Sequence, residues 1–136
     1  MPQLRLALAQ VNARVGDLDG NAELVLDACR NAAERGAHLV VLPEMVLTGY
    51  PIEDLAYRAS FIAASQRTVD ALATRLDDEG LGDLVAIVGH LDRAKHVSDR
   101  LGTPKNAPTN SASVLSGRRV VPRYDKHHPP QRPHGQ

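Results

Sequence analysis

Aromatic residues are scarce in this chain of 136 residues: three Tyr, one Phe and no Trp make up only 3% of it. Because 43% of the residues are nonetheless hydrophobic, a core has to be built from Ala, Val, Leu and Ile. The chain is short enough to make at most one domain. It has a single cysteine, Cys29, and this excludes an internal disulfide framework.

An excess of one charge is also missing, since 16 basic and 16 acidic residues give a formal net charge of zero. The composition therefore offers no field that would attract nucleic acid or a membrane surface. No apolar run approaches the roughly 18 residues that a membrane span requires. The N-terminus lacks the basic and apolar pattern of a signal peptide, so we expect a cytoplasmic protein without nucleic-acid or membrane partners.

Hydrophobic periodicity predicts two helices and five strands. We expect helices over about 22–35 and 56–78, and strands over 4–10, 38–42, 84–90, 109–115 and 119–124. The apolar run at 84–90 is typical of a strand buried on both faces. Residues 92–108 are polar and predict an exposed loop, and Ser116-Gly117-Arg118 fits a hairpin turn. The alternation of strands and helices indicates an α/β fold.

Glu44 is the first candidate for chemistry. Pro43 cannot continue the strand over 38–42, so the strand should stop there and leave Glu44 at its end. Parallel α/β folds place their chemistry at such ends, and a carboxylate there can act as a base. Spacing alone leaves equally open that Glu44 is a solvated turn residue.

A family resemblance favours the base. The segment at 42–55 reads LPEMVLTGYPIEDL, and it resembles the catalytic-glutamate segment of the nitrilase, or carbon–nitrogen hydrolase, superfamily. Its continuation, GYP followed by EDL, resembles one branch, the glutaminase domain of glutamine-dependent NAD synthetases. Residues 4–12 (with Gly16-Asp17 and Asn21 after them), 110–115 and 123–128 resemble the opening strand, central strand and catalytic-lysine segment. The resemblance implies the first half of a nitrilase-like α-β-β-α sandwich.

The resemblance implies a role for three residues. Glu44 corresponds to the base and Lys126 to the lysine that stabilises an oxyanion, although Lys126 taken alone would be an ordinary surface lysine. If the strands over 38–42 and 119–124 are neighbours, these two side chains come within a few ångströms of each other. Tyr50 either lines the substrate pocket or the interface to a synthetase domain, or is a packed loop aromatic.

The family's nucleophilic cysteine lies beyond the lysine, and this chain has no cysteine there. Cys29 shares the apolar face of the first expected helix with Val25 and Ala32, so we expect it to be buried and inert. We therefore expect no nucleophile in this chain and no activity from the chain alone.

The last eight residues differ from the rest. Residues 129–136 hold three prolines and no apolar side chain, which suggests a truncation or a shifted reading frame. We therefore divide the chain into a partial carbon–nitrogen hydrolase domain over 1–128 and a tail over 129–136. His127, His128 and His134 match no known metal-site spacing, so no metal site is expected.

In the family, the glutaminase domain hydrolyses glutamine, and the ammonia amidates ATP-activated deamido-NAD in a synthetase domain. The resemblance therefore implies glutamine as the substrate and a homo-oligomeric assembly. ATP and Mg²⁺ are implied only for the synthetase domain, whose glycine-rich nucleotide signature this chain lacks, and no cofactor is expected on these residues. Two alternatives stay open: a stand-alone amidase of the same superfamily, and a non-catalytic remnant.

Overall fold

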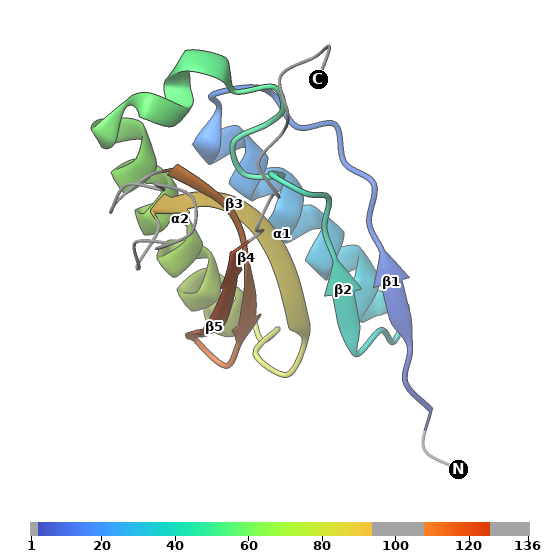
Figure 1. The fold of residues 1–136 in the computed structure, drawn as a ribbon. Coiled ribbons are helices and arrows are strands. Elements are labelled where there is room, and N and C mark those ends of the chain that lie inside the picture. Colours follow the sequence, from blue (N-terminus) through green and yellow to red (C-terminus); the bar gives the residue numbers. More distant parts are fainter. Residues whose placement is uncertain (1–2, 94–107, 126–136) are drawn as a thin grey trace, which may run out of the picture.

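The computed structural model describes residues 3–93 and 108–125 of the chain. Its elements, in chain order, are β1 (Leu6–Leu8), α1 (Leu18–Glu34), β2 (Leu39–Val41), the 3₁₀ helix η1 (Glu53–Tyr57), α2 (Ala59–Asp78), β3 (Val85–Arg93), β4 (Pro108–Ser116) and β5 (Arg119–Asp125). The strands form one sheet in the order β1-β2-β3-β4-β5 (Figure 1). The expected α/β fold class, with strand and helix alternating before three final strands, is confirmed.

The direction of the strands decides where the helices lie. β1, β2 and β3 are parallel, and α1 and α2 are the crossovers between them. Right-handed crossovers that progress in one direction across a sheet place their helices on the same face, and Figure 1 shows both helices behind the strands. β4 and β5 are antiparallel neighbours, so β5 runs in the same direction as β2 and β3. The carboxyl ends of β2, β3 and β5 therefore lie at one edge of the sheet.

The core lies between the helices and the covered face of the sheet. Its buried cluster contains only Ala, Val and Leu side chains and one cysteine: Ala22, Val25, Leu26, Cys29, Ala32, Val40, Leu42, Val46, Leu47, Val69, Leu72, Ala73, Leu76, Leu84, Ala86, Val88 and Leu115. A core of small and branched aliphatic side chains was the expectation from the shortage of aromatics, and it is confirmed. Such side chains allow the helices to pack closely on the strands.

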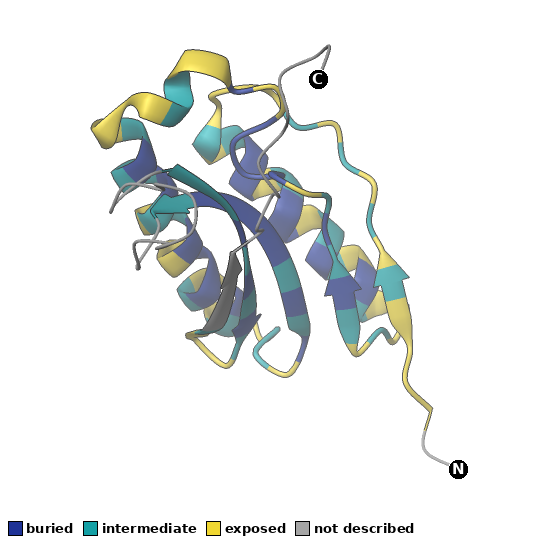
Figure 2. Ribbon diagram, viewed as in Figure 1, coloured by how far each residue is buried: buried dark blue, intermediate teal, exposed yellow. Residues whose placement is uncertain are grey.

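The other face of the sheet is open among the described residues. The strand register places Leu8, Val41, Ile87, Val114 and Val121 in one apolar row across all five strands. None of the five is buried, and Leu8 is 74% exposed. Dark blue and teal therefore alternate along the first part of β3 in Figure 2, before a continuous dark blue stretch. The expectation that the strand over 84–90 is buried on both faces holds at residues 88–90 and is wrong at Val85 and Ile87, because helices cover only one face. The expected half-sandwich has this uncovered face.

Several helices and strands begin or end at residues other than those expected from the sequence, for local chemical reasons. α1 begins at Leu18 rather than near residue 22, because Asp17 caps it and accepts a hydrogen bond from the Gly20 amide at 3.0 Å. η1 is separate from α2 because Arg58 between them has an extended backbone, with ψ of 115°. β3 continues to Arg93, so the expected loop over 92–108 is shorter at its start, and its residues 94–107 lie outside the described part.

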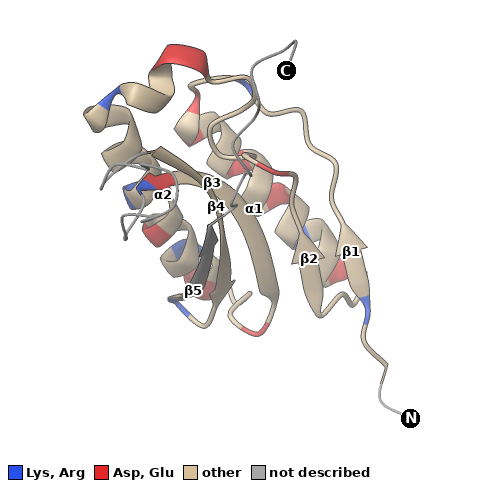
Figure 3. Cartoon of the chain, viewed as in Figure 1, with Lys and Arg blue, Asp and Glu red and all other residues tan. Residues whose placement is uncertain are grey.

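Charges of both signs lie along the two α-helices, whereas the middle strands of the sheet are almost free of them (Figure 3). Within the residues that the structure describes, no helix combines the length and the apolar character that crossing a bilayer demands.

Candidate active site at the carboxyl end of β2

Glu44 lies in a tight loop that follows β2 and turns back over β3. The Leu42 amide donates to the Ile87 carbonyl at 3.0 Å, and the Leu47 amide donates to the Gly89 carbonyl at 3.2 Å. Met45 adopts a φ of 55° between these two anchors. The loop is thus fixed to β3 on both sides of Glu44, whose side chain is exposed.

Gly89 allows this close approach of the loop to β3. A Cβ atom at Gly89 would lie 2.5 Å from the Met45 amide nitrogen and 3.0 Å from the Pro43 carbonyl oxygen. Real Cβ atoms are not found at the shorter distance, so any other residue would displace the loop. The absence of a side chain at Gly89 therefore sets how close Glu44 lies to the sheet.

Asn21 ties this loop to the one that follows β1. Its side chain is fully buried at the start of α1. The amide nitrogen donates to the Leu47 carbonyl at 2.8 Å and to the Arg14 carbonyl at 2.7 Å, and the amide oxygen accepts from the Arg14 backbone nitrogen at 2.8 Å. One side chain therefore hydrogen-bonds backbone groups of two loops, and it supplies a donor to the buried Leu47 carbonyl.

The pocket beside Glu44 is an open hollow of about 360 Å³. It is lined by Leu42, Pro43, Glu44, Ile87, Gly89, Asn110, Ser111 and Ala112. Asn110, on β4, donates a hydrogen bond from its side-chain amide to the Glu44 carboxylate. A carboxylate that is fixed by an amide and faces a partly apolar hollow is suited to exchanging a proton with a small bound molecule.

The structure brings Glu44 to Asn110, and it corrects the expected arrangement of strands. β2 and β5 are not neighbours, because β3 and β4 lie between them. Three strand spacings separate the two strands by roughly 14 Å, so strand adjacency does not place Lys126 beside Glu44. Lys126 lies outside the described residues. Asp125, the last residue of β5, pairs with Ser111, which is the neighbour of Asn110.

Tyr50 does not line this pocket. It is 78% exposed, which excludes the packed loop aromatic that was one of its expected alternatives. Its proposed roles at the substrate or at a domain interface stay predictions.

Cys29 is a core residue, as expected from its helical spacing. It has no exposed surface and belongs to the same buried cluster as Val25 and Ala32. Burial raises the pKa of its thiol to about 11, so almost no thiolate is present at neutral pH. Cys29 is therefore unsuited to nucleophilic attack.

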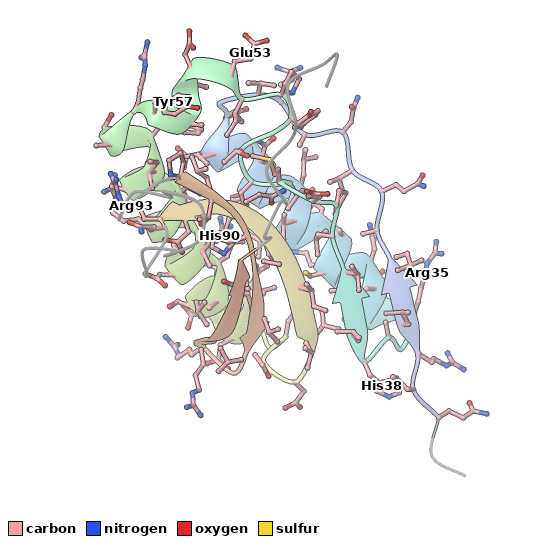
Figure 4. The ribbon with its side chains drawn as sticks, in the orientation of Figure 1. Arg35, His38, Glu53, Tyr57, His90 and Arg93 are labelled. Atoms are coloured by element: carbon pink, nitrogen blue, oxygen red, sulfur yellow. The ribbon has the colours of Figure 1, made fainter. Side chains whose placement is uncertain are left out.

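No metal centre is found in residues 3–93 and 108–125, where no three His, Cys, Asp or Glu side chains are grouped as ligands. His127, His128 and His134 lie outside these ranges. His90, labelled in Figure 4, is 2% exposed, and its Nε2 is 2.7 Å from the Ser113 hydroxyl. A buried, paired histidine of this kind stabilises the contact between β3 and β4.

Sequence reasoning gave no role to Gly89 or Asn110. Gly89 carried a usable signal, since a lone glycine inside an apolar strand indicates close approach of another backbone. Asn110 carried none by itself, because its partner Glu44 is 66 positions away and only the sheet register brings the two together.

A second hollow, of about 650 Å³, lies between α1 and α2 and holds none of the candidate residues. Acidic and basic side chains line it, and Arg75 of α2 hydrogen-bonds Glu23 of α1, which lowers the pKa of that carboxyl. The pair joins the two helices at the surface, where ion pairs contribute little to stability.

The comparisons with known proteins agree with the motifs. The family model for carbon–nitrogen hydrolase matches residues 5–136. A glutamine-dependent NAD(+) synthetase from Rhodobacter capsulatus is 36% identical over 128 residues, which is 94% of this chain and 21% of that protein. One from Thermotoga maritima is 38% identical over 88 residues, covering 65% of this chain and 15% of that protein. The chain thus spans about a fifth of the length of these relatives.

Solved structures show the same fold. The glutamine-dependent NAD+ synthetase from Acinetobacter baumannii superposes with a TM-score of 0.73 at 25% identity, over 98% of this chain and 23% of that one. An amidase from Nesterenkonia sp. superposes with a TM-score of 0.64 at 25% identity, over 93% of this chain and 44% of that one. The resemblance stated from the motifs is confirmed, and the chain belongs to the carbon–nitrogen hydrolase family.

Proposed function

We propose that this chain supplies the general base of a glutaminase unit in a glutamine-dependent NAD synthetase. The observation that carries the proposal is the placement of Glu44 at the carboxyl edge of the sheet, held by Asn110 beside a pocket of about 360 Å³. The curated relatives reported above are all glutamine-dependent NAD synthetases, and this favours glutamine over other amides as the substrate.

In this proposal, Glu44 takes the proton from a cysteine thiol as the sulfur attacks the side-chain amide carbon of glutamine. Lys126 donates hydrogen bonds to the oxygen that becomes negative in the tetrahedral intermediate. Glu44 then gives the proton to the departing ammonia, and water hydrolyses the remaining thioester to glutamate. Cys29 is buried in the core, so the proposal assigns the nucleophile to a residue other than these 136.

ATP and Mg²⁺ belong, in this proposal, to a synthetase unit and not to the described residues. These residues include no group of three metal-ligating side chains, and neither hollow has a glycine-rich loop that could hold phosphates. We therefore derive no step through either cofactor on this chain.

A stand-alone amidase is the second candidate. It rests on the Nesterenkonia amidase, whose structural match extends over 93% of this chain. A mutant of that amidase has been solved with acrylamide added to its active-site cysteine. Both candidates require Glu44 as the base, so they differ in the substrate and in what happens to the ammonia.

A chimera tests the proposal. The chain replaces the matching segment of the Rhodobacter capsulatus relative, and NAD formation is measured with glutamine or with ammonium as the nitrogen source. We expect the chimera to use glutamine, and we expect the isolated 136-residue chain to release no glutamate from it. A folded chimera that uses ammonium but not glutamine would contradict the proposal, as would turnover by the isolated chain that disappears in Cys29→Ala. Faster hydrolysis of acetamide than of glutamine by the chimera would favour the amidase.

A further inference from the structure

Asn110 lies on β4 and Glu44 in the loop that follows β2, and β3 separates these two strands in the sheet. Both residues line the same pocket as Gly89 of β3, which pairs with Ala112 of β4. The space next to Gly89 is filled by the backbone of the Glu44 loop, and this close approach brings Glu44 within hydrogen-bonding reach of Asn110.

Each partner in this contact is fixed by its neighbours. Asn110 pairs in register with Leu91 of β3. Leu91 and Met45, the residue after Glu44, belong to the same small buried cluster. The residues beside Asn110 are also joined, since the Thr109 and Ser111 hydroxyls lie 2.8 Å apart. The backbone of Asn110 is thus fixed by the pairing of β4 with β3, next to the cluster that holds the Glu44 loop.

A side-chain amide has two effects on a carboxylate that it binds. The donated hydrogen bond is stronger to the ionised form, so it favours the state that can accept a proton. The contact also restricts rotation of the carboxyl group about its last torsion, which is otherwise broad. The first effect concerns the charge of the carboxyl group, and the second concerns its orientation beside Leu42 and Ile87, which line the pocket.

We propose that Asn110 is a positioning residue for Glu44, which keeps the carboxylate ionised and fixes its plane toward the pocket. The role of Glu44 as a base rests on the proposed function, whereas the effect of Asn110 on the ionisation of Glu44 rests on the contact between their side chains.

The test is a site-resolved titration of Glu44 in the full 136-residue chain. Carboxyl-directed labelling read by mass spectrometry gives the midpoint at low protein concentration, and selective ¹³C labelling of glutamate gives it by NMR. Asn110→Leu removes the donor at similar size, and Asn110→Asp keeps the shape but replaces the donor with a negative charge. Asn31→Leu changes an exposed asparagine of α1 and is the matched control.

We expect Asn110→Leu to raise the Glu44 midpoint by about half a unit to one unit. Asn110→Asp should raise it further, because like charges disfavour each other, and Asn31→Leu should leave it unchanged. If Asn110→Leu does not fold, Asn110→Asp alone decides the question because its shape is the same. A folded Asn110 variant with the wild-type midpoint would overturn the proposal.

Failure of the two proposals can be told apart. In the chimera described above, Asn110→Leu should shift the acidic limb of the pH profile of kcat upward by a similar amount. If Asn110→Leu shifts the Glu44 midpoint but the chimera never uses glutamine, the role of Asn110 stands and the glutaminase proposal is rejected. If the chimera uses glutamine but Asn110→Leu leaves the Glu44 midpoint unchanged, the glutaminase proposal stands and the role of Asn110 is rejected.

Discussion

A Cβ atom on Gly89 would lie 2.5 Å from the backbone nitrogen of Met45, the residue that directly follows Glu44. The candidate base is therefore placed by a contact between two backbones. The loop can lie this close to β3 only while residue 89 has no side chain.

Replacing Gly89 with alanine should destabilise the fold and displace Glu44. We expect Gly89→Ala to lower the free energy of unfolding by about 1–3 kcal/mol, because the added methyl group overpacks a site filled by backbone. Urea unfolding measures this change, and carboxyl labelling reports whether Glu44 has become more accessible.

Gly80→Ala is the matched control for that substitution. Gly80 has a φ of +80° and nothing within 4 Å of an added Cβ. Gly80→Ala should therefore lower the free energy of unfolding by about 1 kcal/mol through backbone strain alone. Labelling of Glu44 should stay unchanged. Equal labelling of Glu44 in both variants would show that Gly89 does not position the loop.

Asn21 should contribute to the stability of the fold, although it does not line the pocket beside Glu44. Asn21→Ala leaves the buried Leu47 carbonyl without its side-chain donor and removes one of the two donors to the Arg14 carbonyl. We expect a loss of about 1–3 kcal/mol in the free energy of unfolding, compared with a loss of under about 0.5 kcal/mol for Asn31→Ala on the surface. Urea unfolding of both variants checks this. A similar small loss for both would mean that Asn21 does not hold the two loops together.

The buried thiol predicts a loss of stability at high pH. The folded-state pKa of Cys29 is raised from 9.0 to about 11 by burial, so folding favours the protonated thiol. This contribution is fully present below about pH 9 and is lost as the pH rises through about 11, a decrease of about 2–3 kcal/mol. Urea unfolding between pH 8 and 11 should therefore show a smaller decrease for Cys29→Val than for the wild type. Parallel pH curves would contradict the assignment, as would rapid alkylation of the native thiol at pH 8.

The sequence was sufficient to predict those features of the structure that a local pattern controls. Pro43 ends β2 next to Glu44, helical spacing buries Cys29 with Val25, and the turn residue Gly117 joins β4 to β5. Each of these depends on residues within about one helical turn or one hairpin, where propensity and periodicity are informative.

The sequence was insufficient where distant residues meet. The structure places Arg118 of the hairpin against Asp77 and Asp78 at the end of α2, a contact between residues about 40 positions apart that no local pattern predicts. The order of the strands was also undetermined, and the condition that the strands over 38–42 and 119–124 are neighbours is not met. The Asn110–Glu44 contact depends on that same order, since it spans β3.

The central claim is that Glu44 is the base for glutamine hydrolysis, and a glutamate-to-glutamine comparison in the chimera tests it most directly. Glu44→Gln removes the proton acceptor at nearly constant shape, and Glu34→Gln makes the same change at an exposed position near the end of α1. We predict that Glu44→Gln lowers glutamine-dependent NAD formation by about 10²-fold or more and leaves ammonium-dependent formation unchanged, while Glu34→Gln alters neither. Full glutamine-dependent activity in Glu44→Gln would contradict the account.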